Sequence, residues 1–220
     1  SDKAVHPCNV YGASKMLAEQ LVISENARCF AQGLRCSVIR YGNVLASNGS
    51  VVRLWRDCLA AGNPLPVSDV RMTRFWLTLD DAVGHVLHAV GDLRGGEVFV
   101  PDLKAASLLR VATALLPNYT DAPNPEDQDL TPESAPNWIT TSGIRPGGEK
   151  LHEELLSSDE LRRAVKRNGF YVVPPVRTVE SWDAAPWLGQ PIQDGLTYRS
   201  DTWVDRWTVD ELREVLARQC

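Results

Sequence analysis

The spacing of apolar residues divides the start of the chain into a helix followed by a strand. Apolar positions at helical spacing, set among Ala, Lys, Glu and Gln, predict a helix from Tyr11 to Gln32 that ends at Gly33. The short, β-branched stretch Arg35–Tyr41 is typical of a buried parallel strand and runs into a glycine turn at Gly42. Helix, strand and glycine turn in this order form half of an α/β repeat.

The same reasoning predicts the later elements. We expect helices at about Val51 to Ala61, from Thr78 to Val90, at about Lys150 to Leu156, near Ser158 to Arg167 and from Thr208 to Arg218, and a strand at Glu97 to Val100. Thr208 and Glu211 have the spacing of a capping box, which marks the start of the last helix.

One stretch has a composition that opposes folding. Pro117 to Asn137 holds five prolines and five acidic residues. Such a segment buries little apolar surface, so we expect a flexible acidic surface loop. We expect an α/β fold overall, with residues 1–46 as the C-terminal part of a Rossmann NAD(P)-binding domain and residues 47–220 as a mixed substrate domain.

Composition narrows the class of protein. The 220 residues are 44% hydrophobic, enough for a packed core, and the net charge of −5 comes with no long Lys/Arg run. We therefore expect neither nucleic acid nor a membrane as partner. No apolar stretch approaches the roughly 20 residues that span a bilayer, which favours a cytoplasmic protein.

The cysteine and histidine patterns favour neither disulfides nor a metal site. The five cysteines are Cys8, Cys29, Cys36, Cys58 and Cys220, an odd number without a C-x-x-C pair. The four histidines show no ligand spacing shared with Asp or Glu. We expect reduced thiols and no metal.

Two groups of residues near the start could carry chemistry. Tyr11 and Lys15, at i and i+4, project from one helix face, where a nearby cation favours the phenolate and makes tyrosine a better base. Just upstream, Ser1, Asp2 and Lys3 place a hydroxyl, a carboxyl and an amine in succession. The alternative for both groups is solvated surface residues.

The order of several motifs resembles one family. These motifs are Ser1-Asp2-Lys3-Ala4-Val5, Tyr11-Gly12-Ala13-Ser14-Lys15, Arg40-Tyr41-Gly42-Asn43-Val44, Met72-Thr73-Arg74-Phe75-Trp76, and Gly143-Ile144-Arg145-Pro146 with Glu149-Lys150-Leu151-His152-Glu153-Glu154. Together they resemble the inverting UDP-N-acetylglucosamine 4,6-dehydratases, which are lyases and extended short-chain dehydrogenase/reductases of polysaccharide biosynthesis. The similarity continues into the tail at Tyr198-Arg199-Ser200-Asp201-Thr202.

The resemblance implies a catalytic cycle on bound NADP, or NAD. Tyr11, assisted by Lys15 and Ser1, would take the 4-hydroxyl proton of a UDP-N-acetylhexosamine while hydride leaves C4. Lys3 would then remove the C5 proton and Asp2 would protonate the departing 6-hydroxyl. Return of hydride to C6 and protonation of C5 from the opposite face would invert C5.

The resemblance also implies binding residues. Tyr11, Lys15, Tyr41 and Gly42 would lie at the cofactor. Arg145 would bind the diphosphate and Glu149 the uridine ribose, with Asn43 and Arg74 as further substrate contacts. An ordinary ion pair or a turn-stabilising bond is the alternative for each of these substrate contacts.

The sequence also departs from the family pattern. It contains no G-x-x-G-x-x-G or G-x-G-x-x-G motif, so it resembles the C-terminal part of a longer enzyme. Gly147-Gly148 has one glycine more than the family pattern, and Asn48 stands where an Arg is usual. We do not expect this polypeptide to turn over by itself.

Two other functions remain open from the sequence. A UDP-sugar 4-epimerase would use Tyr11 and Lys15 but would not need the acid and base at Asp2 and Lys3. A non-catalytic protein that binds nucleotide-sugar would fit the missing glycine motif. The resemblance further implies a homo-oligomer for the full-length form, paired through the Tyr11 helix.

Overall fold

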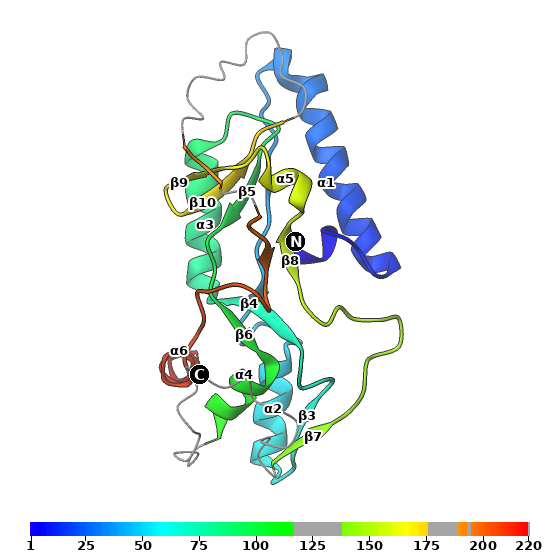
Figure 1. The fold of residues 1–220 in the computed structure, drawn as a ribbon, viewed down its shortest axis with the longest axis vertical. Helices are drawn as coiled ribbons and strands as arrows, with labels where there is room; N and C mark the ends of the chain where they lie inside the picture. The colour runs from blue at the N-terminus through cyan, green and yellow to red at the C-terminus, as the bar shows by residue number, and fades with distance from the viewer. Residues whose placement is uncertain (117–137, 176–188, 193–194, 220) are drawn as a thin grey trace.

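The computed structural model describes residues 1–116, 138–175, 189–192 and 195–219, and they form two stacked parts (Figure 1). The upper part holds α1, α3, α5 and a five-stranded sheet, and the lower part holds α2, α4 and α6 around short strands. The acidic loop expected at residues 117–137 lies outside the described residues.

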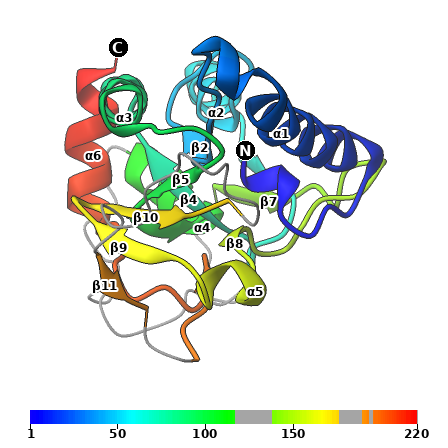
Figure 2. The same ribbon diagram turned by 90° about the horizontal axis from the view of Figure 1, so that it is seen from above.

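The sheet of the upper part has the strand order β1-β5-β10-β9-β11. Its strands are β1 (Val38–Ile39), β5 (Val98–Pro101), β10 (Phe170–Val173), β9 (Val165–Arg167) and β11 (Gln190–Pro191). β1 and β5 are parallel, and each remaining pair is antiparallel. Seen from above, α1 (Val10–Cys29) and α3 (Leu79–Asp92) lie toward one side of the molecule, with α5 (Ser158–Leu161) and β11 at the other (Figure 2).

The lower part encloses its own apolar core. Its helices are α2 (Val51–Ala60), α4 (Leu108–Leu115) and α6 (Val209–Arg218), and its strands are β2 (Asn43–Val44), β3 (Leu65–Val67), β4 (Thr73–Leu77), β6 (Ala105–Ser107) and β7 (Ile139–Thr141). Trp55, Leu65, Leu109 and Leu212 are fully buried there. This part is held together mainly by apolar burial.

Four short elements complete the fold. The 3-10 turns η1 (Asp2–Ala4) and η2 (Phe30–Gln32) flank α1, and β8 (Glu154–Leu156) pairs with β12 (Tyr198–Arg199). Arg40 lies buried between the elements: its guanidinium donates to Glu19 on α1 at 2.9 Å and forms a two-point contact with Glu160 on α5. A planar guanidinium suits this geometry because it offers two parallel N–H donors.

The expected α/β fold is confirmed, and so are most of the predicted helices. Capping boxes begin α3 at Thr78 and α6 at Thr208, as the sequence indicates for Thr208. The strand predicted at Glu97 to Val100 forms as β5 and pairs in parallel with β1. Four of the five strands of that sheet come from beyond residue 46. The division of the chain into two domains at that residue stays a prediction.

Two predicted helices were wrong. Residues 154–156 form strand β8 rather than the end of a helix, because Leu155 and Leu156 are fully buried and pair with the tail strand β12. The helix expected near Ser158 to Arg167 stops at Leu161, and β9 follows. Asn168 and Gly169, both with positive φ, then turn the chain into β10 as a hairpin.

Candidate active site

A cavity of about 870 Å³ lies where the N-terminal turn, α1 and the loop before β8 meet the lower part. Six of the predicted site residues line it: Lys3, Tyr11, Asn43, Arg74, Arg145 and Glu149. The other five, Ser1, Asp2, Lys15, Tyr41 and Gly42, are not on its wall. Residues that are far apart in the sequence therefore meet at one cavity.

The turn η1 brings Asp2 and Lys3 into contact. The Ser1 side chain caps it by accepting from the Lys3 amide at 3.3 Å. The Lys3 ammonium donates to Asp2 Oδ1 at 3.1 Å, and Asp2 is only 2% exposed while Lys3 reaches the cavity. The other carboxylate oxygen, Asp2 Oδ2, is buried and has no hydrogen-bond partner in the described part of the chain.

A glycine allows this turn to lie against α1. A Cβ at Gly12 would come within 2.7 Å of the Lys3 carbonyl oxygen, closer than side chains allow. Asn9 caps α1 by accepting from the Gly12 amide at 2.8 Å, and its own amide donates to the Gly148 carbonyl at 2.9 Å. The start of α1 is thus held to both the turn and the glycine loop.

Tyr11 and Lys15 lie together on α1, as their spacing predicts. The Lys15 ammonium is 5.1 Å from the centre of the Tyr11 ring, and Tyr11 is 58% exposed. Because Tyr11 is exposed, a bound ligand would have to cover it to exclude water.

Arg74 is buried beneath the cavity and engages protein carbonyls. Its guanidinium donates to the backbone oxygens of Thr73 at 2.7 Å, Leu151 at 3.1 Å and Lys150 at 2.9 Å. Glu153, also buried, lies 3.8 Å from the Arg74 Nε. The sequence indicated Arg74 as a substrate contact, and here it supports the loop that borders the cavity.

Arg145 and Glu149 face each other at the rim. The Arg145 Nε is 2.9 Å from Glu149 Oε1, and Arg145 is largely exposed. Gly147 and Gly148 both have positive φ, so the additional glycine is used in the turn that brings Glu149 to the wall. An exposed guanidinium here is available to an anionic ligand.

Tyr41, Gly42 and Asn43 lie where the chain passes from β1 into β2. A Cβ at Gly42 would come within 2.3 Å of the Phe75 carbonyl oxygen, so the glycine permits close packing on β4. Asn43 Oδ1 is buried and unpartnered among the described residues. Asn43 therefore lines the cavity and holds an unused acceptor, whereas Gly42 has a packing role.

Sequence reasoning named no role for several cavity residues. Cys8, Asn9, Lys150 and Glu153 also line the cavity, and Lys150 and Glu153 come from a motif that had been noted without roles for them. Four cations, Lys3, Arg74, Arg145 and Lys150, line the wall with two carboxylates, Glu149 and Glu153. This excess of positive charge favours an anionic ligand.

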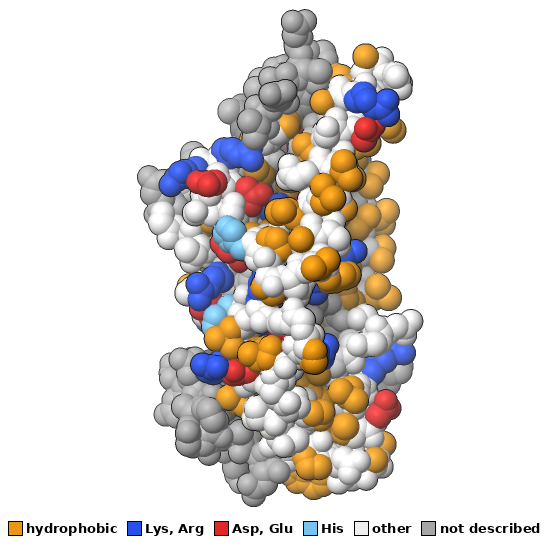
Figure 3. Space-filling model, turned by 90° about the vertical axis from the view of Figure 1, so that its right-hand side faces the viewer, with side chains coloured by type: hydrophobic (Ala, Val, Ile, Leu, Met, Phe, Trp, Pro, Cys, Tyr) orange, Lys and Arg blue, Asp and Glu red, His pale blue; other side chains and the backbone are white. Residues whose placement is uncertain are grey.

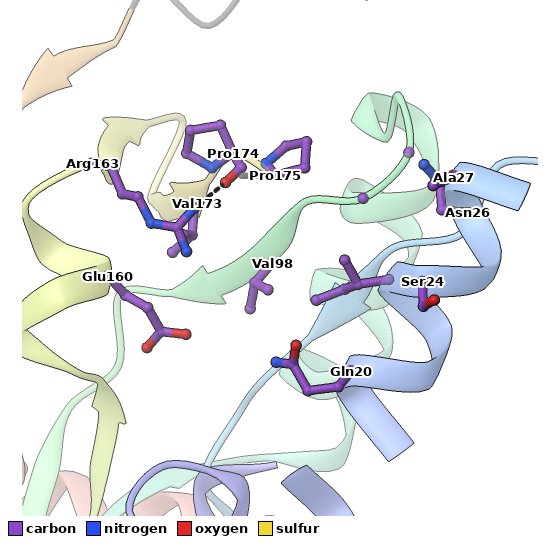
Figure 4. Close-up of a pocket in the computed structure, with 13 residues that line it drawn as sticks. Gln20, Ser24, Asn26, Ala27, Val98, Glu160, Arg163, Val173, Pro174 and Pro175 are labelled. Carbon is purple, nitrogen blue, oxygen red and sulfur yellow. Dashed lines mark hydrogen bonds between the residues drawn. The ribbon is translucent and has the colours of Figure 1, made fainter. Parts of the chain in front are cut away.

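A second cavity, of about 340 Å³, lies between α1, β5 and α5 (Figure 4). Gln20, Ser24 and Asn26 face Glu160 and Arg163 across the floor residue Val98. None of the predicted site residues lines it. It lies along the C-terminal half of α1, whereas the first cavity meets the start of this helix.

Neither a metal cluster nor a membrane-spanning helix occurs in the described residues. His85 and His88 pack on the Phe170 ring at centroid distances of 5.4 and 4.8 Å. Burial lowers the pKa of His85, which keeps its imidazole neutral in this apolar setting.

The chain matches the polysaccharide biosynthesis protein family over residues 1–175. The chain belongs to this family. Every predicted site residue lies within the matched range. The similarity to inverting UDP-N-acetylglucosamine 4,6-dehydratases inferred from the motifs is confirmed by the relatives below.

Known relatives of this polysaccharide biosynthesis protein carry nucleotide-sugar names. The UDP-N-acetylglucosamine 4,6-dehydratase (inverting) of Campylobacter jejuni strain 81-176 is 36% identical over 208 residues, covering 91% of this chain and 57% of the relative. The UDP-glucose 4-epimerase of Rickettsia canadensis is 37% identical over 175 residues, covering 79% of this chain and 47% of the relative. The chain thus spans about half the length of these relatives.

A solved structure has the same fold. The X-ray structure of Pen from Bacillus thuringiensis superposes with a TM-score of 0.78 at 27% identity, and the match covers 99% of this chain and 59% of that one. Nearly the whole chain therefore follows an arrangement seen in another protein.

Proposed function

We propose that the protein to which this chain belongs is a nucleotide-sugar 4,6-dehydratase that acts on a UDP-N-acetylhexosamine and inverts C5. The observation that carries the proposal is the hydrogen-bonded Asp2–Lys3 pair at the edge of the cavity that Tyr11 also lines. An acid, a base and a phenol beside one cavity suit removal of water from a sugar.

The Asp2–Lys3 contact supports the assigned roles. Dehydration requires a neutral amine to take the C5 proton and a protonated carboxyl to give a proton to the departing 6-hydroxyl. Transfer of one proton along the 3.1 Å bond from Lys3 Nζ to Asp2 Oδ1 produces both forms with no change in net charge.

Tyr11 and Lys15 support the oxidation of C4. The phenolate of Tyr11 takes the 4-hydroxyl proton, and the Lys15 ammonium stabilises that phenolate. A bound nicotinamide cofactor, NADP or NAD, supplies hydride acceptance from C4 and hydride return to C6. Of the residues assigned to the cofactor, exposed Tyr11 and half-buried Lys15 would hold its ribose, whereas Gly42 is closed off by Phe75.

The positively charged wall supports a diphosphate ligand. Arg145 is exposed at the rim and would form a two-point contact with phosphate oxygens in exchange for its pair with Glu149. Glu149 is then free to accept from ribose hydroxyls. Lys150 and Arg74 would add long-range attraction, because their donors are already used by protein oxygens.

A product analysis tests the proposal. The full-length protein, incubated with UDP-N-acetylglucosamine and NADP, should form a 4-keto-6-deoxy product with inverted C5, detected by NMR. Lys3→Met should abolish product. Lys166→Met, which removes from β9 an ammonium that pairs with Asp102, should leave the rate unchanged. A fully active Lys3→Met variant would show that the assigned base is wrong.

A 4-epimerase is the second candidate, because relatives of this chain carry that name. It needs Tyr11 and Lys15 but no proton transfer at C5. If the protein is an epimerase, NMR will show the C4 epimer with an intact 6-hydroxyl, and Lys3→Met will retain turnover.

A further inference from the structure

Lys150 makes contacts that none of the roles above requires. Its ammonium donates to the backbone carbonyl of Asp2 at 3.1 Å and to that of Val5 at 2.6 Å. These two carbonyls flank η1, the turn that carries Asp2 and Lys3. Lys150 therefore bridges both ends of this turn from a position 145 or more residues away in the chain.

The turn uses most of the donors of this ammonium. An ammonium carries three N–H groups. Two are donated to the carbonyls, and Glu153 Oε2 lies 3.1 Å from the ammonium as an ion pair without a hydrogen bond. The Lys150 side chain lines the cavity but is only 13% exposed, so its contacts serve the turn more than a phosphate.

Arg74 holds Lys150 in turn. It donates to the Lys150 and Leu151 carbonyls, and it shares the buried carboxylate of Glu153 with the Lys150 ammonium. The hydrogen bonds of Arg74 fix the backbone at residues 150 and 151, and the Glu153 carboxylate holds both cations by charge. The result is a continuous chain of contacts from β4 through Arg74 and Lys150 to the η1 backbone.

We propose that Lys150 is a positioning residue that sets the placement of Asp2 and Lys3, and that it governs dehydration rather than oxidation of C4. The inference rests on the proposed function. Tyr11 and Lys15 lie on α1 and, within the described part of the chain, form no hydrogen bond or ion pair with Lys150. Asn9 caps α1 through the Gly12 amide. We therefore expect loss of Lys150 to displace them less than Asp2 and Lys3, whose turn Lys150 holds directly.

Two measurements on Lys150→Met test this in the full-length protein with NADP. Absorbance at 340 nm after mixing with UDP-N-acetylglucosamine follows C4 oxidation, and exchange of the C5 proton with deuterated solvent follows the action of Lys3. We expect oxidation within about twofold of wild type and C5 exchange lower by about 100-fold, because an ångström-scale misplacement costs about that much. Lys166→Met, the matched control outside the cavity, should change neither.

A third measurement needs no turnover. Amide hydrogen exchange of residues 2–6 should be faster in Lys150→Met than in wild type, while exchange in α1 should be unchanged. Unchanged exchange of residues 2–6, or an equal loss of both chemical steps, would overturn the positioning role. Should Lys150→Met fail to fold, Lys150→Arg replaces it, since a planar guanidinium does not repeat both carbonyl contacts and should give the same split at smaller size.

Failure of the proposed function would look different. In that case wild type itself would form no 4-keto-6-deoxy product, whereas the amide exchange result would still report whether Lys150 holds the turn.

Discussion

Helices α1 and α4 are held in the protein in opposite ways. α4 buries Leu108, Leu109 and Val111 in the lower core, and most of its other residues are buried too. α1 is much longer but buries only Gly12, Glu19, Asn26 and Cys29, and its leucines remain exposed. The region that carries the candidate catalytic residues therefore depends on polar anchors, and the lower region depends on apolar burial.

Apolar residues are exposed on both α1 and α3. Val10, Leu17 and Leu21 of α1 are more than half exposed, as are Leu79, Leu87 and Val90 of α3. Apolar side chains gather along the α1 side of the molecule (Figure 3). The region that depends on polar anchors thus also exposes apolar side chains on two of its helices.

Removing the central polar anchor should have the largest effect. Arg40→Ala leaves the Glu160 carboxylate, 18% exposed, without its cation and should lower the free energy of unfolding by about 3–5 kcal/mol. Urea unfolding of the chain measures this. Arg162→Ala, which breaks only an exposed pair with Asp159, should change the free energy by at most about 1 kcal/mol. A small effect of Arg40→Ala would show that α1 is anchored by other contacts.

A pair of leucine truncations tests the contrast directly. Leu109→Ala removes a fully buried side chain from α4 and should cost about 2–5 kcal/mol. Leu21→Ala, on an exposed position of α1, should stay within about 0.5 kcal/mol. Both are read by urea unfolding, and equal costs would remove the proposed difference between the helices.

Acid should weaken the polar anchor specifically. Burial alone would raise the pKa of Glu160, but the hydrogen bonds and charge of Arg40 outweigh burial and lower the pKa. A carboxyl with a lowered folded pKa stabilises the fold above its unfolded pKa, near 4.5, and this stability is lost as pH falls through the folded pKa. Wild type should therefore lose unfolding free energy below about pH 4.5, and Glu160→Gln should flatten that slope. An unchanged slope would assign the acid sensitivity elsewhere.

Matched helix caps should give the smallest effect. Thr78→Ala removes the capping box of α3 and Thr208→Ala that of α6, and each should cost about 1 kcal/mol. If the two regions unfold together, each variant shifts the whole urea transition. Two separate transitions, each moved by only one variant, would show that the regions unfold independently.

The sequence predicted elements whose signals are local. Thr208 and Glu211 mark the start of α6 within four residues, and the i, i+4 spacing of Tyr11 and Lys15 was enough to bring them together. Residues 150–156 were misassigned because their helical composition competes with pairing between β8 and β12, a partner far along the chain. α4 was missed because its eight residues are fewer than the roughly 11–18 over which helical spacing of apolar residues is read.

The candidate site shows the same limit. Asp2, Lys3 and Tyr11 were found from neighbouring motifs, but the role of Lys150 depends on contacts with Asp2 and Val5 that no spacing reveals. The i, i+3 spacing of Lys150 and Glu153 is typical of an exposed ion pair, whereas their side chains are only 13% and 6% exposed at the cavity.

Tyr198 has a consequence for biosynthesis. Its ring is fully buried against Phe75 and Trp203, and its hydroxyl donates to the Pro101 carbonyl while accepting from the Leu103 amide. A nascent chain that has not yet emerged from the ribosome as far as Trp203 lacks the centre of its upper core. Premature stop codons before Tyr198 should therefore yield an aggregation-prone product, even though every proposed catalytic residue has already been translated.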